Sequence, residues 1–380
     1  MSQRDVLVIG AGSIGERHAR CFLATGRARV AVVEPRAEIR ERIARDYGIV
    51  THATLDQALG SRFDVAVICT PAPLHVPQAL RLVEAGLHVL LEKPVSTSEE
   101  GLPELERLLA TRKTMLSVAY VYRAFPELQQ MRDRLMRGEW GTPLELTVNA
   151  GQHFPTYRPA YREIYYTRHE TGGGAIQDAL THLLNLGEWL VGPISRLVCD
   201  AAHLALPGVT VEDTVHLLAR HSAQPGATAV ETGHEKSPAG ADVLASYALN
   251  QHQAPNEIHV QVVCERGTVK CEVHGQRLKW MTAPQTDWQQ QEFGPRERDA
   301  VYRAQAEAFL DALDGRGHVA CSLREGWQTL RVNLAALQSA REGSWQILPS
   351  WAGRTTAQLG ATRDWRNSRQ ATNRIEGDNR

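Results

Sequence analysis

An aspartate and a histidine four residues apart, Asp178 and His182, follow three consecutive glycines in residues 172–182. On a helix this spacing places both side chains on one face, where a carboxylate can orient an imidazole and tune its proton affinity for acid–base chemistry. Taken alone, such a pair is more often a contact that only stabilises the helix. A zinc site would need further ligands, and the sequence has neither an H-E-x-x-H motif nor a cysteine cluster, so we predict no metal.

A glycine-rich turn follows the apolar run at residues 6–9. Gly10 would permit a tight turn, Gly12 would let the backbone approach a pyrophosphate at a helix N-terminus, and Gly15 would let that helix pack on the strand. Glu34 ends the next predicted strand 19 residues after Gly15, where it would accept hydrogen bonds from the adenosine ribose. We therefore predict dinucleotide binding. The residues predicted to hold the cofactor here are Gly10, Gly12, Ser13, Ile14, Gly15, Glu34 and Arg36.

Two further segments follow predicted strands and add candidate site residues. The first contains Thr70, Pro71 and His75, and the second is the triplet of Glu92, Lys93 and Pro94. Ligands of an open α/β sheet bind beyond the carboxyl ends of its strands, so both segments would project toward the cofactor. Without that location, a Glu-Lys pair would more often be a solvated surface pair.

The elements that would position these motifs alternate between strand and helix. The strands are nearly continuous apolar runs, as expected when helices cover both faces of a parallel sheet. This pattern indicates an α/β Rossmann domain over residues 1–124. The predicted strands are 6–9, 29–33, 64–69, 88–91 and 115–118, and the predicted helices are 13–25, 37–47, 75–85 and 99–111.

The pattern changes past residue 125. Segments rich in β-branched residues, separated by Gly, Pro and Asn, indicate an α+β domain with a large, mostly antiparallel sheet over residues 125–350. The polar stretch 351–380 lacks periodicity and is predicted to be a flexible tail. The predicted elements are a helix ending at 138, strands 144–150, 211–219, 228–232, 243–248, 258–264 and 268–273, and helices 174–191, 301–313 and 323–341.

Composition limits the partners of the chain. Of 380 residues, 43% are hydrophobic and 22% charged, and the formal net charge is −1, so nothing in bulk charge favours binding to nucleic acid or to a membrane. Six scattered cysteines without a C-x-x-C pair suggest ordinary thiols, and no apolar run is long enough for a signal-peptide core or a membrane span. We expect a cytoplasmic protein.

Together these motifs resemble the glucose-fructose oxidoreductase, inositol dehydrogenase and rhizopine-catabolism (Gfo/Idh/MocA) family of nicotinamide-dependent oxidoreductases. The resemblance covers residues 6–348. It rests on the glycine turn at 10–15, the T-P-x-x-x-H segment at 70–75, the E-K-P triplet at 92–94 and the G-G-G-x-x-x-D helix at 172–182. Three positions depart from the family pattern: Leu180 replaces a glycine, Asn185 an aspartate, and Val121 the asparagine of G-Y-N-x-R-F.

The resemblance implies hydride transfer between a nicotinamide and a secondary alcohol or ketone, with Lys93, Asp178 and His182 as the catalytic residues. His182 would transfer the proton, Asp178 would orient it, and Lys93 would donate to the reacting oxygen. NAD is preferred because Glu34 would repel a 2′-phosphate, although Arg36 leaves NADP open. The residues expected to bind substrate are Lys93, Tyr120, Arg123, Tyr161, Arg162, Tyr165, Asp178 and His182.

The substrate class expected is a sugar, sugar acid, cyclitol or nucleotide sugar. The loop 152–170 is rich in tyrosine and arginine, which suits such a ligand, and an oligomer contact is the competing interpretation. Because few predicted helices remain to cover both faces of the large sheet, we expect a homodimer or homotetramer. The alternatives are an NAD-dependent glycoside hydrolase that uses transient oxidation and a regulatory protein that kept the nucleotide fold without catalysis.

Overall fold

The computed structural model describes residues 3–222 and 242–349. The strand predicted at 228–232 and the tail predicted at 351–380 lie outside the described residues. Within the described ranges, no helix has the length and apolar character needed to cross a membrane.

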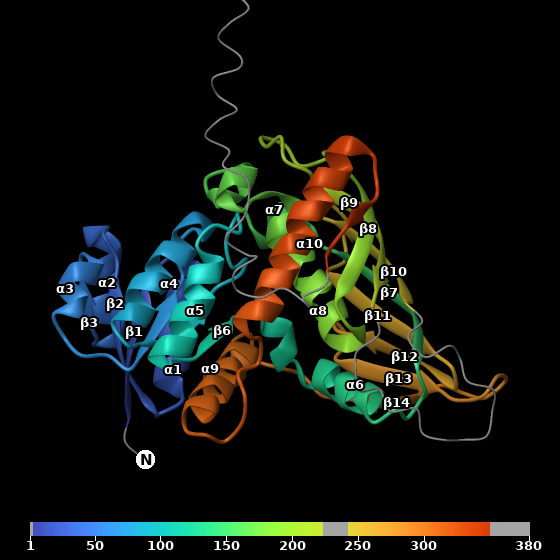
Figure 1. The fold of residues 1–380 in the computed structure, drawn as a ribbon, viewed down its shortest axis with the longest axis horizontal. Helices are drawn as coiled ribbons and strands as arrows, with labels where there is room; N and C mark the ends of the chain where they lie inside the picture. Colours follow the sequence, from blue (N-terminus) through green and yellow to red (C-terminus); the bar gives the residue numbers. More distant parts are fainter. Residues whose placement is uncertain (1–2, 223–241, 350–380) are drawn as a thin grey trace, which may run out of the picture. The chain divides into compact units, whose positions relative to one another are not determined.

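The N-terminal part is built on a six-stranded parallel sheet with strand order β3-β2-β1-β4-β5-β6 (Figure 1). This order belongs to the doubly wound dinucleotide-binding fold and confirms the predicted Rossmann domain. The central strands are almost fully buried, as their continuous apolar runs require. The strands are β1 Arg4–Ile9, β2 Ala28–Val33, β3 Val50–His52, β4 Val65–Ile68, β5 His88–Leu91 and β6 Leu116–Val118.

The helices between these strands are α1 Ser13–Ala24, α2 Ala37–Tyr47, α3 Leu55–Leu59, α4 His75–Glu84 and α5 Leu102–Arg112. The sequence analysis missed β3 and α3, because segments of three and five residues are too short to show a periodicity. The segment with Thr70 and His75 therefore follows the fourth strand of the chain.

The C-terminal part contains a nine-stranded sheet with order β14-β13-β12-β11-β7-β10-β9-β8-β15. Its strand pairs are antiparallel except β7 and β10, so the sheet is mixed but mostly antiparallel, as predicted. The strands are β7 Pro143–Gly151, β8 Ile194–Ala202, β9 Thr214–His221, β10 Val243–Asn250, β11 Glu257–Cys264, β12 Gly267–Glu272, β13 Arg277–Met281, β14 Gln289–Glu292 and β15 Gln346–Ile347.

The remaining helices are α6 Pro126–Met136, α7 Phe154–Tyr157, α8 Thr181–Val191, α9 Ala300–Leu313 and α10 Leu323–Glu342. Side chains of α6, α8 and α10 form one core with the inward face of the nine-stranded sheet, and α8 and α10 lie along it in Figure 1. By contrast, Ala306, Phe309 and Leu310 of α9 lie in the core of the Rossmann sheet. The chain thus returns to its first domain after the large sheet.

The opposite side of the nine-stranded sheet, which we call the open face, is covered by no described helix. Along its strands buried and partly exposed residues alternate, which is the pattern of a sheet with one core face. Large apolar side chains point outward from neighbouring strands, including Leu218, which is 54% exposed, and Leu244, which is 52% exposed. An apolar group of this kind is typical of a contact surface.

Candidate active site

The glycine turn between β1 and α1 has the geometry that dinucleotide binding requires. Gly10 has φ +87°, and a Cβ at Gly15 would lie 1.8 Å from the carbonyl oxygen of Gly10, so both positions need glycine. A Cβ at Gly12 would meet nothing within 4 Å, which leaves the backbone open to a ligand. No side chain caps the N-terminus of α1, so its free N–H groups suit an anionic pyrophosphate.

Glu34 lies at the end of β2, as predicted, and is already engaged by protein groups. Its carboxylate accepts hydrogen bonds from the backbone N–H of Ala11 at 2.9 Å and from Arg36 Nε at 2.7 Å. Burial alone would raise the pKa of Glu34, but these hydrogen bonds lower it below its usual value. Arg36 is largely exposed and partly neutralises the acid, so the acid alone does not set the charge facing the ribose.

The predicted segments after β4 and β5 are joined through His75. Its Nδ1 lies 2.9 Å from the carbonyl oxygen of Pro94, and its Nε2 lies 2.7 Å from that of Thr70. The ring is buried, which lowers the pKa of His75. Pro71 precedes a short 3₁₀ turn, Ala72–Leu74, that leads into α4. This histidine therefore holds the two strand ends together from inside the fold.

Glu92 connects β5 to the helix that follows the glycine turn. Its Oε1 lies 2.7 Å from Nε2 of His18 on α1, and its Oε2 accepts from the backbone N–H of Lys93 at 3.1 Å. Burial raises the pKa of Glu92, but the contact with His18, the nearby charge of Lys93 and the backbone N–H of Lys93 together outweigh it, and the net shift is downward. The contact keeps the start of the E-K-P triplet in register with α1.

Lys93 and Asp178, 85 residues apart, meet at the carboxyl end of β5. The Lys93 Nζ donates to the backbone carbonyl of Asp178 at 2.7 Å and to its Oδ1 at 3.2 Å. The Tyr165 hydroxyl donates to the same Oδ1 at 2.6 Å. Burial would raise the pKa of Asp178, but the nearby cations Lys93 and Arg158 and the hydrogen bond from Tyr165 bring it to about 2. Asp178 is therefore a carboxylate at any physiological pH.

His182 has aromatic neighbours, and no described hydrogen bond joins it to Asp178. Its ring centroid lies 5.2 Å from that of Tyr122 and 5.9 Å from that of Tyr120, and its buried Nδ1 has no hydrogen-bond partner in the structure. Burial, with a contribution from the charge of Lys93, lowers the pKa of His182 well below its usual value. The imidazole is therefore neutral near pH 7. The sequence analysis paired Asp178 with His182, whereas the structure pairs Asp178 with Lys93.

The helix predicted at 174–191 begins with a wider turn. Residues Ile176–Leu180 form a π-helical segment, and α8 starts only at Thr181. Glu212, from the segment before β9, accepts from the backbone N–H of Ile176 at 2.9 Å and lies 2.5 Å from His169 Nε2. Gly174 has φ +85°, and a Cβ there would lie 2.6 Å from the Glu212 carboxylate. Glu212 and His169 thus position the backbone that carries Asp178; the sequence analysis did not name Glu212 and included His169 only as part of the loop 152–170.

Four predicted substrate-binding residues are hydrogen-bonded to other groups of the chain; three of them are buried, and Arg162 is exposed. The Tyr120 hydroxyl lies 3.1 Å from Oγ1 of Thr181, and the buried Arg123 donates to Asn185 at 2.9 Å. The amide at 185, one of the departures from the family pattern, thus serves as an internal acceptor. Two more side chains share one acceptor, the Pro207 carbonyl oxygen, which takes hydrogen bonds from Tyr161 at 2.7 Å and from Arg162 at 2.8 Å.

The site also has members that the motif analysis did not identify. Tyr122 packs on His182, and Tyr302 of α9 lies beside His18 with ring centroids 5.9 Å apart. Arg158, within the aromatic loop, is exposed, and its charge acts on Asp178 and His182. These residues come from segments far apart in the sequence; Arg158 lies in the loop noted for its tyrosines and arginines, whereas no local pattern marks Tyr122 or Tyr302.

The fold and the site together are those of a two-domain, nicotinamide-dependent oxidoreductase. Residues 4–120 match the model of the oxidoreductase family with an NAD-binding Rossmann fold, and residues 128–276 match the Gfo/Idh/MocA C-terminal domain. The chain therefore belongs to the Gfo/Idh/MocA family, as its motifs predicted, and its N-terminal domain has that family's NAD-binding Rossmann fold.

Relatives with assigned names include several dehydrogenases. The myo-inositol dehydrogenase Hyg17 of Streptomyces leeuwenhoekii is 27% identical over 90% of this chain and 99% of its own length. The rhizopine catabolism protein MocA of Rhizobium meliloti is 29% identical over 49% of this chain and 56% of its own length. Three of the first relatives align over only 53–56% of their own length. Among solved structures, levoglucosan dehydrogenase in complex with NADH superposes with a TM-score of 0.80 at 19% identity, covering 92% of this chain and 100% of that one.

Proposed function

We propose that this protein transfers a hydride between NAD and a secondary alcohol or ketone of a sugar, sugar acid, cyclitol or nucleotide sugar. The observation that carries the proposal is the contact of Lys93 Nζ with Asp178 at the carboxyl end of β5, with His182 four residues further along the chain from Asp178. An ammonium and a neutral imidazole in one place are the groups that a carbinol hydroxyl needs in order to lose its proton.

The cofactor would be held mainly by backbone. The turn at Gly10, Gly12 and Gly15 and the N-terminus of α1 would bind the pyrophosphate, with Ser13 and Ile14 in its first turn. Glu34 and Arg36 would face the adenosine ribose, and Thr70, Pro71 and Lys93 follow β4 and β5, at the carboxyl edge of the sheet where the cofactor would lie. When bound, the nicotinamide accepts or returns the hydride.

Proton transfer would be divided between two residues. Lys93 donates a hydrogen bond to the reacting oxygen and stabilises negative charge as it develops there. His182, neutral near pH 7, accepts the hydroxyl proton in oxidation and returns it in reduction. Asp178 fixes the position of the Lys93 ammonium and supplies the negative charge that compensates it, so its part in the reaction is to position Lys93.

The guanidinium of Arg158 favours a substrate that carries an anionic group. Among the described residues no carboxylate or carbonyl accepts a hydrogen bond from its guanidinium, although it lies close enough to Asp178 to affect that pKa. An arginine in this state can bind a carboxylate or phosphate in bidentate fashion. We therefore favour a sugar acid or a phosphate-bearing sugar over a neutral polyol. The Arg158→Ala variant would raise KM for an acidic substrate more than for its neutral analogue.

The oligomeric state and location complete the proposal. We propose a homodimer or homotetramer that buries the open face, supported by Leu218 and Leu244 exposed there. A monomeric mass by light scattering at micromolar protein would contradict it.

We also propose a cytoplasmic location, supported by six cysteines that are all buried and unpaired.

A substrate screen tests the function. Purified protein is offered inositols, anhydrosugars, sugar acids and nucleotide sugars with NAD or NADP, and the change in nicotinamide absorbance is followed together with the products. We expect NAD-dependent turnover of at least one secondary alcohol, absent in Lys93→Ala. Product formation without net change in NADH would favour redox-assisted glycoside hydrolysis. The relatives named above are dehydrogenases or catabolic proteins, so that alternative and a purely regulatory role are not favoured.

A further inference from the structure

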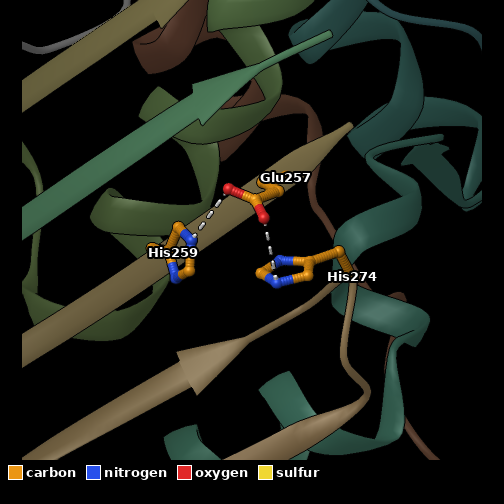
Figure 2. A group of neighbouring side chains, drawn as sticks. All are labelled: Glu257, His259 and His274. Carbon is orange, nitrogen blue, oxygen red and sulfur yellow. Dashed lines mark ion pairs between the residues drawn. The ribbon is translucent and has the colours of Figure 1, made fainter. Parts of the chain in front are cut away.

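A group of three potential metal ligands lies on the open face, away from the proposed active site residues. Glu257 and His259 are two residues apart on β11, and His274 lies in the turn between β12 and β13 (Figure 2). Because side chains alternate along a strand and Val260 and Val262 point into the core, Glu257 and His259 point outward on the same side. The hairpin then brings His274 next to Glu257.

The spacing of these groups fits one ion. His259 Nε2 lies 3.5 Å from one oxygen of Glu257, and His274 Nε2 lies 3.9 Å from the other. One ligand atom from each residue lies within 4.8 Å of the other two. Tetrahedral ligands about 2.0–2.1 Å from a zinc ion are about 3.3–3.4 Å apart. Small rotations of the side chains would therefore close the site around the ion.

The hydrogen bonding of the two imidazoles leaves their Nε2 atoms available. His274 Nδ1 lies 3.3 Å from both the backbone N–H and the carbonyl oxygen of Ile258, so this backbone contact engages Nδ1 and not Nε2. His259 Nδ1 is buried without a hydrogen-bond partner. Both Nε2 atoms lie at ion-pair distances from Glu257, outside ordinary hydrogen-bond range. A metal ion would satisfy all three groups at once.

The charges around the group also favour a cation. Three cationic side chains of β12 and β13 on this side of the sheet are committed to Glu272, which accepts from Arg277 at 2.6 Å and from Lys279 at 3.0 Å, with Lys270 at 3.9 Å. Within the described ranges, Glu257 has no lysine or arginine partner and pairs with the two histidines alone. The Glu257 carboxylate thus has no contact with a lysine or arginine among the described residues.

We propose that Glu257, His259 and His274 form a binding site for a divalent transition metal, with Zn²⁺ the ion that two imidazoles and one carboxylate suit best. Oxygen-preferring Ca²⁺ and Mg²⁺ are disfavoured by the two nitrogen ligands. In the single chain all three side chains are partly exposed, between 28% and 40%, so water, or a group of a second copy packed on the open face, can complete the coordination. The ion would tie β11 to the turn after β12 on the open face. The sequence analysis predicted no metal, because an E-x-H pair and a histidine 15 residues later form no known spacing.

Zinc titration of the full, untagged chain tests the proposal. After dialysis against chelator, isothermal titration calorimetry with Zn²⁺ should show one ion per chain. The variants His259→Ala and Glu257→Gln should each weaken binding at least about tenfold, the scale reported for disturbing a metal site. His216→Ala, which removes an exposed histidine elsewhere on the same face, is the matched control and should bind as the wild type does.

A second measurement separates binding from folding. Co²⁺ in place of Zn²⁺ should give the weak visible bands of nitrogen and oxygen ligands, without the intense thiolate bands that buried cysteines would produce if exposed. Circular dichroism of each variant confirms that the fold is intact. The proposal is overturned if the wild type binds no Zn²⁺, if His259→Ala and His274→Ala bind it as tightly as the wild type, or if His216→Ala weakens it equally.

Discussion

Two glycine motifs serve the two sides of the proposed active site, and the structure uses them differently. At residues 10–15 each glycine meets only its own turn and neighbouring strand, and the backbone there follows the motif. At residues 172–174 the backbone is set by Glu212 and His169, which lie outside the motif, and a π-helical segment follows. The cofactor side is therefore determined by local chemistry, and the substrate side by contacts between distant segments.

This difference has a consequence for function. A binding site made of backbone tolerates changes in the surrounding side chains, because the N–H groups of a helix N-terminus do not depend on them. A site made of Lys93, Asp178 and Tyr165 depends on each side chain and on the loop that brings it. We therefore expect variants on the substrate side to lose turnover while NAD binding is retained, and variants in the glycine turn to lose NAD binding.

The largest effect is expected at Lys93 and His182. Removing a general acid or base typically costs about 10²–10⁴ in rate, so Lys93→Ala and His182→Ala should each lose turnover on that scale. The double variant should be only slightly worse than the poorer single one, because the two groups act as a unit. The measurements are kcat on an identified substrate and NAD affinity by fluorescence titration.

Asp178→Asn is the matched comparison for this prediction. It keeps the shape of the side chain but removes the charge next to Lys93, so its loss of turnover should be smaller than that of Lys93→Ala. Near-normal turnover of a folded His182→Ala would remove that residue from the mechanism and leave Lys93 as the proton-transfer group.

Low pH should destabilise the folded C-terminal domain through His221, which ends β9. Its ring is buried between the Gly192 carbonyl oxygen at 2.6 Å and the Tyr247 hydroxyl at 2.9 Å, and burial lowers the pKa of His221 from 6.5 to about 4. At acid pH the unfolded chain therefore binds more protons than the folded chain. The stability that the neutral His221 ring contributes is present above pH 6.5 and is lost as the pH falls toward 4. The free energy of unfolding would fall by about 3 kcal/mol in all, because each pKa unit corresponds to about 1.36 kcal/mol.

Thermal unfolding between pH 7 and pH 4 measures this effect. His221→Gln should unfold with a shallower dependence of Tm on pH over the same interval. An equally steep dependence in the variant would assign the acid sensitivity to other groups.

Replacing one glycine of each motif by alanine tests whether the cofactor side and the substrate side of the proposed active site can be disturbed separately. Gly15→Ala would place a methyl group against the Gly10 backbone, and Gly174→Ala would place one against the Glu212 carboxylate at a positive φ. Each should cost about 1–3 kcal/mol of stability, the usual range for overpacking. The comparison predicts that Gly15→Ala loses NAD affinity, whereas Gly174→Ala loses kcat and keeps NAD affinity. The same loss pattern in both variants would show that the two sides are not separable.

The smallest effect is expected at Glu34. Loss of one hydrogen bond to a charged group is worth about 1.5 kcal/mol, so Glu34→Ala should reduce the preference for NAD over NADP roughly tenfold. Arg36, released from its contact with Glu34, would then be available to a 2′-phosphate. Titration with both cofactors measures the change, and NADP binding more tightly than NAD in the wild type would contradict the preference itself.

The amino-acid sequence determined the Rossmann domain, the class of the second domain and the family. Those features depend on local patterns: apolar runs, glycines that only a tight turn explains, and motifs at strand ends. From the resemblance the sequence also predicted Lys93, Asp178 and His182 as catalytic residues, and from their spacing it expected Asp178 to meet His182, whereas the described contact of Asp178 is with Lys93.

Only the tertiary structure decided which groups meet. It brought Asp178 into contact with Lys93 and packed α9 into the core of the Rossmann domain. It also engaged Tyr161, Arg162 and Arg123 in hydrogen bonds within the chain. It also brought Glu257, His259 and His274 together across a hairpin. The physical reason is common to all of these: apolar contacts, hydrogen bonds and ion pairs act over a few ångströms in space, whereas their partners can lie far apart in the chain, as Lys93 and Asp178 do at 85 residues.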